Sequence, residues 1–170
     1  MGIFLTWRRH RTTIRRYTPI WGGYLALGLR MQLYSHILDL RISHPSLNPD
    51  EVTRTLGIEP QHAWRAGDPR QTPKGTSLTG IRTTGYWAAN PFSYGWRIST
   101  DALVEDALEE LLTFLEPHRD FLIKLSKDGN LRIWASTSSN RNYTLDLGPS
   151  LLSHIASLGA TFIHDVYQGA

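Results

Sequence analysis

The residues best suited to chemistry lie in the stretch from 64 to 75, which combines an aromatic side chain, three cations and a carboxylate. A loop that offers successive backbone amides, two glycines and three positive charges can hold a phosphate or a carboxylate. Trp87, in a following segment, can supply an aromatic wall beside it. The candidate ligand-binding residues are Trp64, Arg65, Asp68, Arg70, Lys74 and Trp87.

The same stretch has a structural interpretation. It lacks the strand, GxxxxGK[ST] and helix order of a nucleotide-binding loop, and Asp68 precedes a proline, as turn residues often do. Arg65 can form an ion pair with Asp68 and so pin the loop to the sheet. Carboxylates at Asp39 and Asp165 are alternative partners. We favour pinning for Arg65 and Asp68, which leaves the half from 70 to 75 as the better candidate for contact with a partner.

Other reaction chemistry finds little support in the residue types. The chain has no cysteine, which excludes thiolate nucleophiles and cysteine-based metal sites. Its histidines show neither HExxH nor His-x-His spacing, and no GxSxG motif is present. We therefore expect no metal and no cofactor, and favour a protein that is not an enzyme. An enzyme of unknown type that uses the 64–75 loop is the alternative.

The tryptophans allow two interpretations. Trp64, Trp87, Trp96 and Trp134 lie in or beside expected strands and can frame a groove for a base, a sugar or a peptide. Aromatic residues also commonly fill strand positions in a core. We favour a core and rim cluster.

The charges are distributed unevenly along the chain. Residues 1–30 carry six arginines and no acid, which leaves 12 of the 18 basic side chains against all 15 acidic ones in residues 31–170. We expect 1–30 to be a basic extension, disordered or read from an upstream start, with Met31 as the natural start. Its apolar run at 24–29 is too short to span a bilayer, which takes about 20 residues. The remaining chain is slightly acidic, so we expect neither a nucleic-acid surface nor a membrane contact there.

Hydrophobic periodicity predicts one α+β domain over 31–170. A long loop is expected at 67–80, and Gly57 and Gly159 are expected to end helices. Asn48 is the predicted N-cap of the first helix, and Ser99 or Thr100 that of the second. The order favours a mixed, mostly antiparallel sheet with helices on one face, of ferredoxin-like or duplicated βαβ type. Strands are predicted over 38–43, 58–65, 82–89, 94–99, 131–135, 143–147 and 161–167, and helices over 48–56, 101–116, 118–127 and 149–158.

Several short motifs carry a family resemblance. The most specific runs from Trp64 to Pro69, as Trp-Arg-Ala-Gly-Asp-Pro, and is accompanied by His44-Pro45, Asn48 to Val52, Leu56-Gly57, Tyr86-Trp87, Leu115 to Pro117, Asn142 to Leu145, Pro149 to Leu152, Leu158-Gly159 and Asp165 to Tyr167. Over residues 34–167 this set resembles a bacterial family known as domain of unknown function 4279. The resemblance implies the fold and supplies no activity.

These observations favour a cytoplasmic, non-enzymatic module that binds another protein or a small anionic ligand through the 64–75 loop. An immunity protein that neutralises a toxin is an alternative, because an acidic helix face can steer a basic partner. That face comprises Glu105, Asp106, Glu109, Glu110 and Glu116. The oligomeric state stays open.

Overall fold

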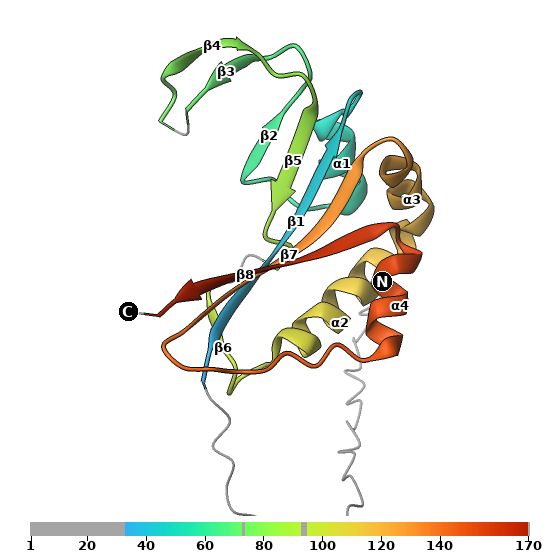
Figure 1. The fold of residues 1–170 in the computed structure, drawn as a ribbon. Helices are drawn as coiled ribbons and strands as arrows, with labels where there is room; N and C mark the ends of the chain where they lie inside the picture. The colour runs from blue at the N-terminus through green and yellow to red at the C-terminus, as the bar shows by residue number, and fades with distance from the viewer. Residues whose placement is uncertain (1–32, 73, 93–94, 170) are drawn as a thin grey trace, which may run out of the picture. The chain divides into compact units, whose positions relative to one another are not determined.

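The computed structural model describes residues 33–72, 74–92 and 95–169, so the prediction for residues 1–30 lies outside it. Figure 1 shows the arrangement of the elements. In chain order these are β1 (Ser35–His44), α1 (Pro49–Leu56), β2 (His62–Trp64), β3 (Pro69–Gln71), β4 (Ser77–Ile81), β5 (Gly85–Ala89), β6 (Arg97–Ile98), α2 (Val104–Leu115), the 3-10 helix η1 (Glu116–His118), α3 (Arg119–Lys127), β7 (Asn130–Ser139), α4 (Pro149–Ser157) and β8 (Ala160–Gln168).

The main sheet has the strand order β2-β5-β1-β7-β8, and β6 pairs with β1 beyond the end of β5. All pairings are antiparallel except that of β7 with β8, which α4 connects. The predicted α+β class and mostly antiparallel mixed sheet are confirmed. β3 and β4 form a separate hairpin beyond the edge strand β2 (Figure 1).

The core lies on one face of this sheet. Along β1, Leu38, Leu40 and Ile42 are buried while the residues between them are partly exposed, because successive side chains of a strand point to opposite faces. All four α-helices pack on the buried side (Figure 1), where they share one hydrophobic cluster with β1, β5 and β7. We call the other side the open face. It carries Asp39, Arg41 and Ser43 of β1.

The helix ends agree only in part with the sequence signals. Gly57 ends α1 in the left-handed conformation, with φ of 68°. Asn48 occupies the N-cap position, but its side chain makes no bond to the helix. α2 begins later than predicted, because the Asp106 carboxylate accepts the Leu103 amide at 3.0 Å. Ser99, the predicted cap, instead accepts the Tyr34 amide at 3.2 Å.

Two stretches differ from the predicted strands. The expected loop at 67–80 contains the β3–β4 hairpin, whose short strands are exposed throughout and so lack the hydrophobic alternation that marks a half-buried strand. The strand expected at 143–147 is wrong. Its apolar side chains pack against the core from extended chain that joins no sheet, and Tyr143 stacks on Tyr34 at 4.7 Å between ring centroids.

The core role of Trp87 can be tested by truncation. Its side chain is fully buried, and its indole donates a hydrogen bond to the Thr53 hydroxyl of α1 at 3.0 Å. Trp87→Ala should lower the free energy of unfolding by about 3–5 kcal/mol, the usual effect of emptying a core aromatic site. Trp64→Ala, on the open face, should lower it by roughly 1–2 kcal/mol. Urea denaturation measures both, and equal losses would contradict this division.

Candidate functional site

Two hollows on the open face share Tyr86. The larger, which we call the hairpin hollow, has a volume of about 820 Å³ and lies between β2 and the β3–β4 hairpin, with Trp64, Asp68, Leu78 and Arg82 in its lining. The smaller, which we call the arginine pocket, has a volume of about 260 Å³. It is lined by Arg41, Ser43, Tyr86, Asn130, Arg132 and Trp134.

Tyr86, Trp64 and Arg82 form a stack of three side chains beside the hollows. Trp64 and Tyr86 face each other across β2 and β5, with ring centroids 4.4 Å apart and planes at 20°. The Arg82 guanidinium lies 3.9 Å from the Trp64 ring centroid. Both groups cannot occupy one face of the indole at these distances, so Trp64 lies between them. Arg82 also donates to the Gln71 carbonyl at 3.2 Å, which ties the hairpin to the stack.

The arginine pocket is built on a register pair of like charges. Arg41 of β1 and Arg132 of β7 lie directly opposite each other on the open face. Arg41 is held by an ion pair with Asp39 at 2.9 Å and by Trp134, whose ring centroid lies 4.0 Å from the guanidinium. Trp134 is fixed in turn, because its indole donates to Asp165 at 2.6 Å. Arg132 is exposed, and its side chain has no hydrogen-bond or ion-pair partner among the described residues.

The phenol of Tyr86 also lines the arginine pocket. Burial raises the pKa of this phenol, Arg41 and Arg132 act to lower it, and Asp39 acts to raise it. The net direction is upward, so the phenol keeps its proton at neutral pH and can donate a hydrogen bond into the pocket.

The sequence-predicted pair Arg65 and Asp68 lies beside the hairpin hollow, where both residues make local bonds. The Arg65 guanidinium contacts Asp50 at 2.5 Å and Asn48 at 3.0 Å, both at the start of α1. Asp68 accepts the backbone amide of Arg65 at 2.7 Å, not its side chain. These bonds tie the loop to the start of α1. The predicted ion pair of Arg65 with Asp68, Asp39 or Asp165, which would have pinned the loop to the sheet, is not formed.

The other candidate residues are dispersed. Trp87 is buried under the opposite face of the sheet and reaches neither hollow. Arg70 and Lys74 are exposed on the hairpin and do not belong to the described lining of either hollow. Trp96 is half exposed at the far end of the open face, beside Tyr167. The structure therefore retains only Trp64 and Asp68 of the predicted set as lining residues.

Sequence reasoning missed the cationic centre of the site. A signal was available, since Asp39, Arg41 and Ser43 are the polar positions that alternate with the apolar ones in β1. Arg132 and Trp134 alternate in the same way in β7. The sequence alone could not show that β1 and β7 are neighbours whose register places Arg41 opposite Arg132.

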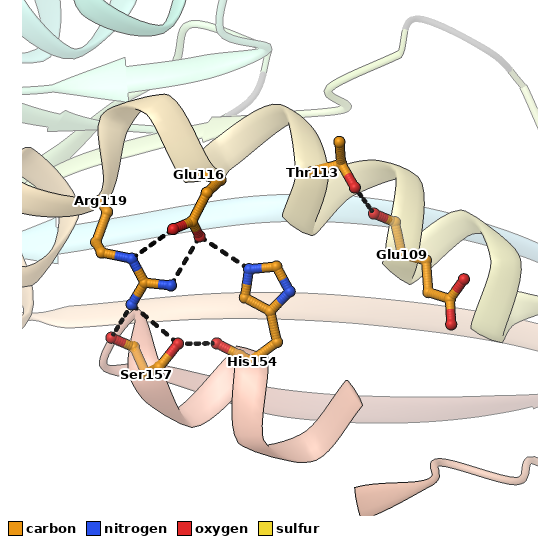
Figure 2. Close-up of polar contacts among 6 residues, drawn as sticks. All are labelled: Glu109, Thr113, Glu116, Arg119, His154 and Ser157. Carbon is orange, nitrogen blue, oxygen red and sulfur yellow. Dashed lines mark hydrogen bonds and ion pairs between the residues drawn. The ribbon is translucent and has the colours of Figure 1, made fainter. Parts of the chain in front are cut away.

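A second cluster has the residue types of a hydrolase but the wrong connections (Figure 2). The Ser157 hydroxyl donates to the backbone carbonyl of His154 at 2.7 Å, not to its ring. The His154 ring instead meets Glu116 at 2.9 Å, and Glu116 accepts two bonds of 2.7 Å from Arg119. Arg119 also donates to the carbonyl and the hydroxyl of Ser157 at 3.0 Å. This network joins η1 and α3 to α4 and activates no nucleophile.

A third polar cluster joins β7 and β8 to the 140–147 segment. The Thr137 hydroxyl contacts the Tyr143 hydroxyl and the His164 ring, the latter at 2.8 Å. Burial lowers the pKa of His164, which favours the neutral ring. Thr137 is fully buried, so no substrate can reach its hydroxyl. The cluster serves to hold the 140–147 segment against the sheet.

Two further properties bear on function. Within residues 33–72, 74–92 and 95–169, no group of three or more histidine, aspartate or glutamate side chains is placed to hold a metal ion. No helix of this part of the chain is both long enough and apolar enough to cross a bilayer.

Comparison with known proteins assigns the family. A family model described as "Domain of unknown function (DUF4279)" matches residues 32–169. The chain belongs to the DUF4279 family. No curated protein and no solved structure matches it. The resemblance found in the motifs is thereby confirmed, and the DUF4279 match includes every residue of the hairpin hollow and the arginine pocket.

The Glu116 network predicts an acid-sensitive contribution to stability. Hydrogen bonds from Arg119, and then from His154, lower the pKa of Glu116 from 4.5 to about 2. A carboxylate with a lower pKa in the folded protein stabilises the fold above its unfolded pKa, and this contribution is lost as the pH falls toward 2. Glu116→Gln should therefore be less stable than the unsubstituted protein at pH 6, with the difference shrinking between pH 4.5 and 2.

Urea denaturation at a series of pH values measures this difference. Glu109→Gln is the matched control, because the Glu109 carboxylate lies in the neighbouring helix α2 and receives none of the bonds drawn in Figure 2. A Glu116→Gln deficit that stays constant down to pH 2 would contradict the role of the charged carboxylate.

Proposed function

We propose that this DUF4279 protein is a binding module for a small anionic ligand, whose anionic group sits in the arginine pocket. The observation that carries the proposal is the direct cross-strand pairing of Arg41 with Arg132. Like charges directly opposite each other in a sheet are destabilising. A bound anion would turn this repulsion into two charge-assisted attractions.

The surroundings of the pair support an anion more than any other occupant. Ser43 and Asn130 face each other two residues further along the same strands, on the same face, and can donate neutral hydrogen bonds. Asp39 and Trp134 already fix the Arg41 side chain, so binding loses little conformational entropy there. The nearby carboxylates of Asp39 and Asp165 are engaged in bonds of their own.

The alternatives receive less support from the geometry. The six lining residues of the pocket include no histidine and no carboxylate to act as a general base, which favours binding over catalysis. The immunity alternative depends on the acidic face of α2 and η1. Several of these acids serve the fold: Glu105 accepts the Asp146 amide at 2.6 Å, Asp106 accepts the Leu103 amide, and Glu116 binds Arg119.

A stability measurement without ligand tests the repulsion. Arg132→Gln should raise the free energy of unfolding by about 0.2–1 kcal/mol, because it removes one of two opposed charges and breaks no bond found in the described residues. Arg41→Gln should lower stability, since it loses the ion pair with Asp39 and the stacking on Trp134. Chemical denaturation in a buffer free of multivalent anions gives both values. A loss of stability in Arg132→Gln would contradict the proposed repulsion.

A thermal shift assay tests anion binding itself. Inorganic phosphate should raise the melting temperature of the unsubstituted protein, because a ligand that binds only the folded state stabilises it. Arg132→Gln should lose most of this shift. Arg54→Gln removes the same charge from an exposed position in α1, on the packed side of the sheet, and should keep the shift. Equal responses of the two variants would count against the arginine pocket.

A further inference from the structure

We propose that the ligand is a nucleotide, with its phosphate between Arg41 and Arg132 and its base stacked on Tyr86. This inference rests on the proposed function, because it assigns a chemical class to the anion in the same pocket. The class follows from an aromatic surface that lies beside the two arginines and is already held in position.

Part of the Tyr86 side chain lines the arginine pocket. One face of its ring is covered by Trp64, which comes from β2 on the far side of β5. The pocket lies on the near side, toward β1 and β7. Among the described residues, Trp64 is the only aromatic ring in contact with Tyr86. Because Tyr86 also lines the arginine pocket, part of its ring is open to a planar group there.

The stack also keeps this ring in place before any ligand arrives. Trp64 is clamped between Tyr86 and the Arg82 guanidinium, and Arg82 is bonded to the hairpin. A rigid aromatic surface loses little entropy when a base stacks on it. Stacking on an aromatic side chain is the usual way in which proteins hold a nucleic-acid base without reading its sequence.

The spacing of the two parts suits one nucleotide. Tyr86 lies opposite Ser43, and Arg41 lies two residues from Ser43 on the same strand and face. Tyr86 and Arg41 are therefore diagonal neighbours across β5 and β1, about 7–8 Å apart, a separation that a ribose can span between its base and its phosphate. Ser43 lies next to both ends, and Asn130 faces Ser43 from β7, so that a hydroxyl and an amide can bond to ribose hydroxyls.

A set of matched ligands tests the inference by calorimetry on the full chain. Adenosine 5′-monophosphate carries both groups, ribose 5-phosphate lacks the base, and adenosine lacks the phosphate. The monophosphate should bind about tenfold more tightly than ribose 5-phosphate, in line with the usual effect of stacking one base. Adenosine should bind most weakly, because it lacks the anion.

Two variants separate the two ends of the site. Tyr86→Leu should remove the advantage of the monophosphate over ribose 5-phosphate. Continued binding of ribose 5-phosphate shows that this variant folds. Arg132→Gln should weaken the binding of both phosphates. Arg54→Gln again serves as the control. Residues 1–30, with six arginines, are present in every protein compared, so only differences between variants are interpreted.

The results separate the identity of the ligand as a nucleotide from the binding of an anion in the arginine pocket. Equal affinity for the monophosphate and ribose 5-phosphate, both lost in Arg132→Gln, would overturn the nucleotide and leave the anion site intact. If Arg132→Gln changes the binding of neither phosphate, both the nucleotide and the anion site are overturned.

A short oligoadenylate shows whether the nucleotide is bound free or as part of a single strand. Tighter binding than the monophosphate, lost in Tyr86→Leu, would indicate a single strand, and no tightening would indicate the free nucleotide; either result supports the class.

Discussion

The alternation of β1 determines what each side of this protein can do. β1 is the central strand, with β5 and β6 along one edge and β7 along the other. Its apolar side chains Leu38, Leu40 and Ile42 all point to the side where the helices pack, so Asp39, Arg41 and Ser43 must point to the other. A shift of the register by one residue would bury these polar side chains and expose the core. The burial of the core therefore also fixes the polar pattern of the open face.

The open face carries charged and aromatic side chains that contribute little to the stability of the fold. Opposed arginines and solvent-facing aromatic rings gain little for folding, and such departures from local rules are expected where a protein binds something. The surrounding bonds limit the loss. Asp39 neutralises Arg41, Trp134 covers it, and Asp165 holds Trp134. Among these residues, Arg132 alone has no hydrogen bond or ion pair within the part of the chain that the structure describes, which is why it is the residue most closely tied to the proposed ligand.

The sequence predicted those features of the fold that depend on the local geometry of a strand or a helix. The period of two in β1 and the leucine stripe of α2 predicted the main strand, the main helix and the packed side. The Trp64 to Pro69 motif lies at the hairpin hollow, since Trp64 and Asp68 line it. It could not show that Arg65 is engaged by α1, because the pairing with Asp50 joins segments whose approach only the folded chain determines.

The missed part of the site depends on long-range register. Arg41 and Arg132 are 91 positions apart in the sequence, and their juxtaposition comes from the antiparallel pairing of β1 with β7. The wrongly predicted strand at 143–147 fails for a related reason. Its alternating apolar residues pack on the core edge, but no strand of the described residues pairs with its backbone, and the Asp146 amide donates to the Glu105 carboxylate instead. Periodicity reports which side chains are buried and not which backbone pairs with which.

The central claim is that an anion binds between Arg41 and Arg132, and its most direct test is anomalous diffraction from a crystal of the protein soaked with tungstate, a heavy analogue of phosphate. The account predicts an anomalous peak within about 4 Å of both guanidinium groups. Peaks confined to Arg70, Lys74 or residues 1–30, with none in the arginine pocket, would contradict it.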